Sequence, residues 1–141
     1  MPSARTLEPW LVQLQPFIRW LTALAFMFVG VLHFTHAEIF ALIVPPWLPA
    51  PMWLVWISGV CEVLGGVGLV VPRTQRLATW GLLALVAAVF PANIYMATEG
   101  IVLPVDGLPQ SDLGRWLRLP WQGVIALQVW FSGLWRPRSR R

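Results

Sequence analysis

Four polar side chains interrupt the apolar stretches of this sequence: His33, Glu62, Asn93 and Gln122. An imidazole and a carboxylate form a natural acid–base pair, because a carboxylate in contact with the ring orients it and favours its protonated form. Such a pair can hold or move a proton, and the two amides add hydrogen-bond donors and acceptors. These residue types suit either recognition of a polar headgroup or proton transfer, provided that the fold brings them together.

The composition says which kind of protein must position them. Of the 141 residues, 57% are hydrophobic and only 11% are charged, whereas a soluble domain carries about 25% charged residues. The chain is therefore expected to be one membrane domain, residues 1–141. Its net charge of +4 does not indicate nucleic-acid binding, because the arginines sit at the ends of apolar segments and form no patch with exposed aromatics.

The expected fold is an all-α membrane protein, a bundle of four transmembrane helices. A helix needs ~20 apolar residues to cross the hydrocarbon core, and four segments qualify: residues 17–36, 51–71, 76–98 and 116–135. The sequence before the first span, WLVQLQPFIRW, predicts a short interfacial N-terminal helix, with Pro16 bending the chain into the membrane.

The arginines predict the orientation of the bundle. One side would carry eight of them: Arg5, Arg19, Arg73, Arg76, Arg136, Arg138, Arg140 and Arg141. The other side would carry Arg115 and Arg118 together with most of the acidic residues. By the positive-inside rule both termini are expected to be cytoplasmic. The protein is expected to cross a bacterial inner membrane several times.

This orientation predicts a polar pocket in the outer half of the bundle. Glu62 would lie near the midplane, and His33, Asn93 and Gln122 would lie above it. Ser58 shares the helical face of Glu62. The alternative is that these side chains only make interhelical hydrogen bonds that fix the packing.

The loop PPWLPAP after the first span holds four prolines, at positions 45, 46, 49 and 51. Prolines stiffen an extended backbone, so this loop, with Trp47, is expected to cover the mouth of the pocket. The predicted ligand-binding residues are therefore His33, Glu62, Asn93, Gln122, Trp47 and Ser58. A packed turn at headgroup level is the alternative.

Metal and thiol chemistry are not expected. His33 and His36 share a helical face, and Glu38 or Glu62 could supply a third ligand, but no recognised closed ligand set is present. Cys61 is the only cysteine. The chain therefore forms no internal disulfide and cannot act alone as a thiol oxidoreductase, which needs two cysteines to cycle.

Four short motifs resemble the DoxX-like family of small four-helix membrane proteins: GVLHF, PPWLPAP, SGVCEVLGGVGL and FPANIYMA. The resemblance covers roughly residues 17–135, and its matches fall on His33, Pro46, Pro49, Gly59, Glu62, Pro91 and Asn93, with a weaker match at Gln122. It implies the four-helix fold. It also implies a link to membrane oxidoreductase complexes, such as thiosulfate:quinone oxidoreductase, or to chaperones that assemble acetylcholine-gated channels.

The function expected from these features is binding of a quinone- or lipid-like small molecule, as an accessory subunit of a membrane redox system and without catalytic activity of its own. One alternative is a membrane-protein assembly factor, whose polar face would bind a client protein. Another is an intramembrane acid–base enzyme acting on a lipid-like substrate. The expected partners are the bilayer and a membrane protein or redox complex, with no nucleic acid, and a homodimer is compatible with each reading.

Overall fold

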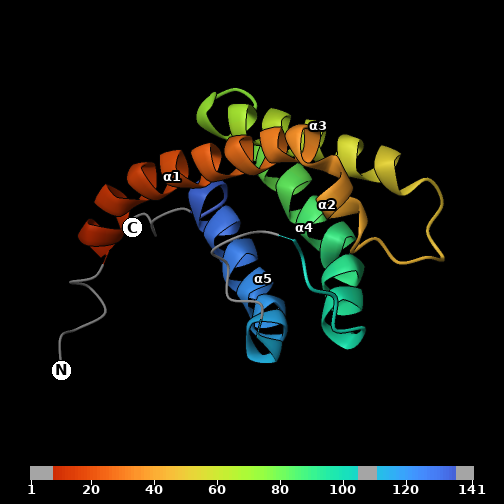
Figure 1. The fold of residues 1–141 in the computed structure, drawn as a ribbon. Coiled ribbons are helices and arrows are strands. Elements are labelled where there is room, and N and C mark those ends of the chain that lie inside the picture. Colours follow the sequence, from red (N-terminus) through yellow and green to blue (C-terminus); the bar gives the residue numbers. More distant parts are fainter. Residues whose placement is uncertain (1–7, 105–110, 136–141) are drawn as a thin grey trace.

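A computed structural model describes residues 8–104 and 111–135 of the chain, and the secondary structure of this part consists of helices, without strands (Figure 1). Its helices are α1 (Glu8–Thr35), α2 (Ala37–Ala41), α3 (Pro51–Val70), α4 (Gln75–Thr98) and α5 (Asp112–Gly133). Three of them, α1, α3 and α4, are long and apolar enough to cross a membrane. The chain is therefore a helical membrane protein, as the composition predicts.

The long helices neighbour one another in a closed ring. α1 packs along α3, α3 along α4, α4 along α5, and α5 returns to α1. Figure 1 shows α1 and α3 running side by side, with α4 and α5 crossing away from them. The short helix α2 packs on α3 and α1. Side chains from all four long helices can therefore meet inside the ring.

The α1–α3 contact depends on small residues. A Cβ atom added to Gly30 would lie 2.8 Å from the Gly59 carbonyl oxygen, and one added to Gly59 would lie 2.8 Å from the His33 Cβ. Further along, a Cβ on Gly66 would lie 2.7 Å from the Ala23 carbonyl oxygen. Backbone atoms cannot yield to such overlaps, so the glycines set how closely the two helices approach.

A set of polar side chains fastens the C-terminal end of α5. Gln15 donates to the Phe131 carbonyl at 2.9 Å, and Arg19 and Gln75 donate to the Ser132 carbonyl at 2.8 and 3.2 Å. The last carbonyls of a helix have no partner within the helix. Side chains from α1 and α4 satisfy them here, and we call Gln15, Arg19 and Gln75 the α5 clasp.

The sequence prediction of a separate interfacial helix before the first span is wrong, and the α5 clasp explains why. The structure has one helix from Glu8 to Thr35, with Pro16 inside it. Proline removes one backbone hydrogen bond and favours a kink, but Gln15 and Arg19 on either side are held by α5. These contacts stabilise the helix through Pro16.

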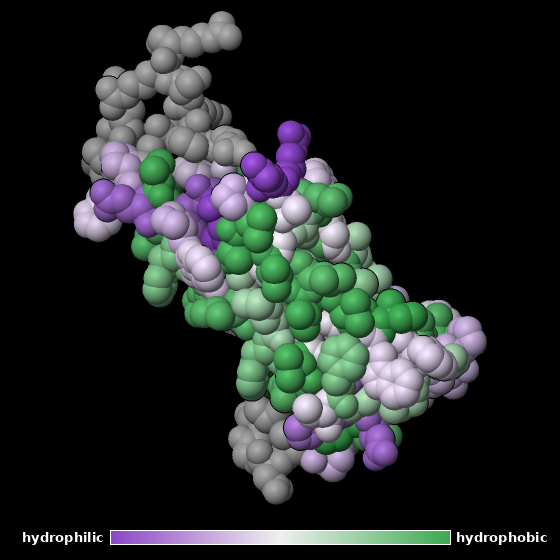
Figure 2. Space-filling view, turned by 90° about the horizontal axis from the view of Figure 1, so that it is seen from above, coloured by the Kyte–Doolittle hydropathy of each residue, from purple (hydrophilic) through white to green (hydrophobic). Residues whose placement is uncertain are grey.

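The surface is apolar over the middle of the molecule. Figure 2 shows hydrophobic residues across the centre of the face that it presents, with hydrophilic residues gathered toward the two ends. On α1 and α3, large exposed apolar side chains include Phe28, Val31, Ile57 and Leu64. Soluble monomers rarely expose so extensive an apolar area to water, so this surface is suited to contact with lipid.

We predict opposite effects of alanine at two helical glycines. Gly59→Ala should destabilise the protein by about 1–3 kcal/mol, because the new methyl group overlaps α1. Gly123→Ala in α5 meets nothing within 4 Å and should be neutral or stabilising by up to about 1 kcal/mol, through helix propensity. Reversible unfolding of both variants in mixed micelles checks this, and equal effects would contradict the close α1–α3 contact.

Candidate functional site

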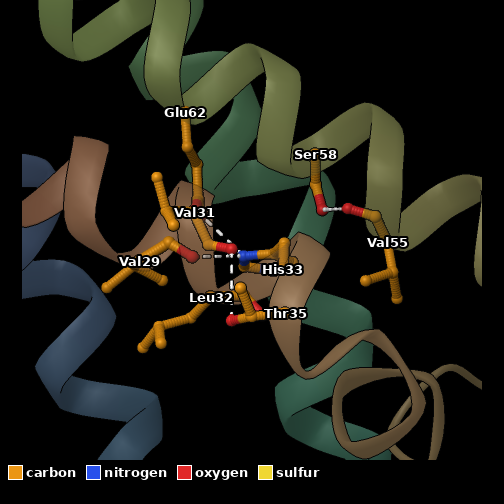
Figure 3. Close-up of polar contacts among 8 residues, drawn as sticks. All are labelled: Val29, Val31, Leu32, His33, Thr35, Val55, Ser58 and Glu62. Atoms are coloured by element: carbon orange, nitrogen blue, oxygen red, sulfur yellow. Dashed lines mark hydrogen bonds and ion pairs between the residues drawn. The ribbon is translucent and has the colours of Figure 1, made fainter.

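The closest polar contact between α1 and α3 joins the two residues that could do acid–base chemistry. His33 Nδ1 lies 3.2 Å from Glu62 Oε2 and 2.9 Å from the Val29 carbonyl oxygen (Figure 3). Both residues are 8% exposed. The His33 ring also stacks on Phe40 of α2, with centroids 4.0 Å apart and planes inclined by 19°. The imidazole is therefore held from three sides.

This geometry determines where the His33 ring carries its proton. The Val29 carbonyl oxygen can only accept a hydrogen bond, so the Nδ1 atom facing it must be the donor. The same proton faces Glu62 Oε2. In the neutral ring Nε2 is then an acceptor, and it has no hydrogen-bond partner among the described residues.

Two cavities of about 420 and 430 Å³ meet at Glu62. The first, which we call the α2 cavity, lies between α1, α2, α3 and α4 and includes His33 and Ser58 in its wall. The second, which we call the α5 cavity, lies toward α5 and includes Gln122. The residues common to both are Glu62, Val89, Asn93 and Arg118.

Arg118 is a functional candidate that the sequence does not single out, because its position near the end of an apolar segment indicates only a charge at the membrane interface. It is partly buried on α5 and lines both cavities together with Glu62. No ion pair joins the two residues, and Arg118 has no hydrogen-bonding or ionic partner within the described part of the chain. The available signal was spacing, since Arg118 and Gln122 stand i, i+4 on one helical face.

The two amides also come to this region. Gln122 Nε2 donates to the Val86 carbonyl of α4 at 3.4 Å, while its Oε1 is buried without a donor among the described residues. Asn93 Nδ2 reaches the Val89 carbonyl of its own helix at 3.4 Å. α4 continues as one helix through Pro91, just before Asn93. The structure thus brings His33, Glu62, Asn93 and Gln122 around adjoining cavities.

The proline loop reaches the α2 cavity, but with other side chains than expected. Leu48 of the loop lines it, together with Ile43 and Val44 just before the loop, whereas Trp47 is 68% exposed and lines neither cavity. The loop therefore covers the cavity with aliphatic groups, and the structure does not place Trp47 with the other predicted site residues. Ser58 lines the α2 cavity, and its hydroxyl donates to the Val55 carbonyl at 2.8 Å.

The other chemically active side chains lie apart from the cavities. His36 is exposed, and its Nδ1 lies 2.8 Å from the Thr35 hydroxyl. Cys61 is a free, exposed thiol. In residues 8–104 and 111–135, no three His, Cys, Asp or Glu side chains lie close enough to hold a metal ion.

A further polar cluster on α5 was also missed. Gln128 donates to the Thr22 hydroxyl at 2.8 Å, and the Thr22 and Ser132 hydroxyls lie 3.2 Å apart. Both Thr22 and Gln128 line the α5 cavity. Polar residues recur on α5 at intervals that keep them toward the bundle, at positions 118, 122, 128 and 132. This recurrence was the sequence signal for a polar helix face.

The ring geometry predicts the tautomer of His33. In ¹⁵N-histidine-labelled protein, the His33 Nδ1 should be protonated at every pH at which the protein is folded. Nitrogen chemical shifts from NMR in micelles check this, with His36→Gln removing the only other histidine signal. A neutral ring protonated on Nε2 alone would contradict the arrangement of Val29, His33 and Glu62.

Comparison with known proteins places the chain in a family. No curated protein and no solved structure matches it. One family model does match, over residues 22–132, which spans the polar clusters and both cavities from Thr22 to Ser132. The chain belongs to this family, which is described as a domain of unknown function (DUF8561).

Proposed function

We propose that this protein binds an amphipathic small molecule inside its helical bundle. The observation that carries the proposal is the placement of Glu62 and Arg118, opposite charges that line the same two cavities without forming an ion pair. Opposite charges that share a cavity but do not touch leave a place between them for a polar group. The polar end of the ligand would lie there, beside His33, Asn93 and Gln122.

A purely structural role fits these charges less well. Removing a carboxylate and a guanidinium from water is unfavourable, and direct pairing is the usual way to offset it. Within residues 8–104 and 111–135, the His33 ring is the one ionic neighbour of Glu62, and the Glu62 Oε2 atom lacks a hydrogen bond of ordinary geometry. A bound polar group would supply the missing partners.

The walls of the cavities indicate the rest of the ligand. Each volume, about 420 and 430 Å³, falls within the range of small-molecule sites, roughly 300–1,000 Å³. Leucine, isoleucine, valine, alanine and phenylalanine make up 11 of the 16 residues that line the α2 cavity and 6 of the 13 that line the α5 cavity. An apolar wall with a few convergent polar groups favours a molecule with a polar headgroup and an apolar body, such as a quinone or a lipid.

We propose that α5 is the fourth membrane span, with both termini in the cytoplasm of a bacterium and the bundle in its inner membrane. A helix of 22 residues is about 33 Å long, which is sufficient. Its low hydropathy comes from Arg118, Gln122 and Gln128, which line the α5 cavity, and from Arg115, which pairs with Asp112. Polar residues directed into a bundle are compatible with a spanning helix.

The DoxX-like resemblance is consistent with this proposal. Three of its motif positions, His33, Glu62 and Asn93, line the cavities, and the motif glycine Gly59 forms the α1–α3 contact. We propose an accessory role in a membrane redox system, in which a partner protein carries out the electron transfer.

Ligand binding should depend on the Glu62 carboxylate. Native mass spectrometry of the detergent-purified protein should show an adduct on the wild type and little on Glu62→Gln, which loses the charge at the cavity floor. Glu99→Gln is the matched control, because Glu99 is exposed at the end of α4, and it should keep the adduct. If wild type and both variants are folded and carry no adduct, the pocket binds no small molecule and the polar cluster serves packing or a client protein.

The orientation can be tested with single cysteines in a Cys61→Ala background. A cysteine at Arg73, in the turn between α3 and α4, should react with a membrane-impermeant maleimide only after the cytoplasmic face is opened. A cysteine at Glu99, at the far end of α4, should react from outside in intact spheroplasts. The reverse pattern would contradict the proposed orientation, and reaction of both from one side would contradict α4 as a span.

A further inference from the structure

Two buried oxygens around the α5 cavity have no hydrogen-bond donor among the described residues: Glu62 Oε2 and Gln122 Oε1. Both side chains line this cavity, and the residues are 8% and 9% exposed. Buried polar atoms in folded proteins nearly always have a partner, because an unsatisfied one loses its hydration without compensation. Two orphan acceptors in the wall of one cavity therefore point to a donor supplied from elsewhere.

The neighbouring Val86 carbonyl determines which amide atom of Gln122 is the nitrogen and which is the oxygen. Its Nε2 faces the Val86 carbonyl oxygen at 3.4 Å, and a flipped amide would place two acceptor oxygens against each other. The atom left over is thus an acceptor. A carboxylate oxygen accepts in either orientation. The His33 Nδ1 proton lies nearer to the Val29 carbonyl oxygen, at 2.9 Å, than to Glu62 Oε2, at 3.2 Å, and makes no hydrogen bond of ordinary geometry with Oε2.

Arg118 supplies the opposite property in the same wall. A guanidinium carries five N–H donors and no acceptor, and Arg118 has no partner among the described residues. A ligand that satisfies these groups therefore needs at least one hydrogen-bond donor and one hydrogen-bond acceptor close together. A hydroxyl group meets both requirements with a single oxygen, whereas a carbonyl or an ether oxygen only accepts.

We infer that the ligand carries a hydroxyl headgroup, as an alcohol or phenol does, which donates to Gln122 or Glu62 and accepts from Arg118. This inference rests on the proposed function and narrows its ligand class. Of a hydroquinone and its quinone, the site selects the hydroquinone. Both orphan oxygens are buried, so the headgroup reaches them after a small rotation of the Gln122 or Glu62 side chain.

A matched pair of probes tests this directly: a 4-alkylphenol and its methyl ether, with the same alkyl chain. The two differ in the donated proton, and neither undergoes quinone chemistry. Affinity is measured from the dependence of the unfolding temperature on probe concentration, in an amine-oxide detergent that has no hydroxyl groups. On wild-type protein the phenol should bind about tenfold or more tightly than the ether, since the ether leaves a buried acceptor unsatisfied.

Two variants test which side chain causes the preference for the phenol over the ether. Gln122→Met keeps the volume of the side chain and removes its acceptor, so the ratio of the two affinities should fall. Cys61→Ala changes an exposed side chain outside both cavities and should keep the wild-type ratio. The comparison on wild-type protein does not depend on either variant, so it stands even if Gln122→Met does not fold.

The outcomes separate this inference from the function on which it rests. Equal binding of phenol and ether, or tighter binding of the ether, overturns the hydroxyl headgroup but leaves a small-molecule site. If phenol, ether, a short-chain quinone and a monoacylglycerol all fail to bind, the proposed function itself fails. If the phenol binds more tightly than the ether, the affinities of a hydroquinone and a monoacylglycerol are compared next. The tighter of the two shows whether the hydroxyl belongs to a redox carrier or to a lipid.

Discussion

The close approach of α1 and α3 is the constraint on which the site depends. Gly30 and Gly59 meet with so little space between them that either Cβ would overlap the other helix. The two helices run in opposite directions (Figure 1), so Glu62 lies opposite Gly30 and His33 lies opposite Gly59. Both side chains therefore leave the same contact, one from each helix. The 3.2 Å approach between the imidazole and the carboxylate follows from backbone packing. Lipid gives no hydrophobic force between helices, so this packing must come from close contact and hydrogen bonds.

The bundle is built differently at its two ends. Where α5 ends, the α5 clasp and the Thr22–Gln128–Ser132 cluster join the helices through hydrogen bonds. The α5 cavity begins at this cluster, and the α2 cavity lies beyond Glu62, where α1 and α4 end, with a mostly aliphatic wall. A fastened end keeps the helices together, so the other end can hold open space around a few polar groups without loss of the fold.

The sequence predicts the four long helices from their length and composition, but it divides α1 at Pro16 and does not predict the short helix α2. It also predicts that His33 and Glu62 meet, since an acid and a base on neighbouring membrane helices have few other partners. It fails at Arg118 and at the α5 clasp for one reason. Arginine and glutamine near the end of an apolar segment are equally suited to the headgroup region and to the bundle interior, and only the rotation of each helix decides between them. Trp47 is predicted to lie at the site and does not, because a loop can reach a cavity with any of its side chains and the sequence does not say which.

The most direct test of a ligand site between Glu62 and Arg118 is a crystal structure of the protein grown from a lipidic mesophase and solved with a phenolic amphiphile present. Electron density for the headgroup should appear in the cavities shared by Glu62 and Arg118, with the apolar body along the aliphatic walls and His33 still against Glu62. A structure in which Arg118 instead pairs directly with Glu62 and side chains fill both cavities would contradict such a site. The polar cluster would then be part of the packing of the bundle and not a binding site.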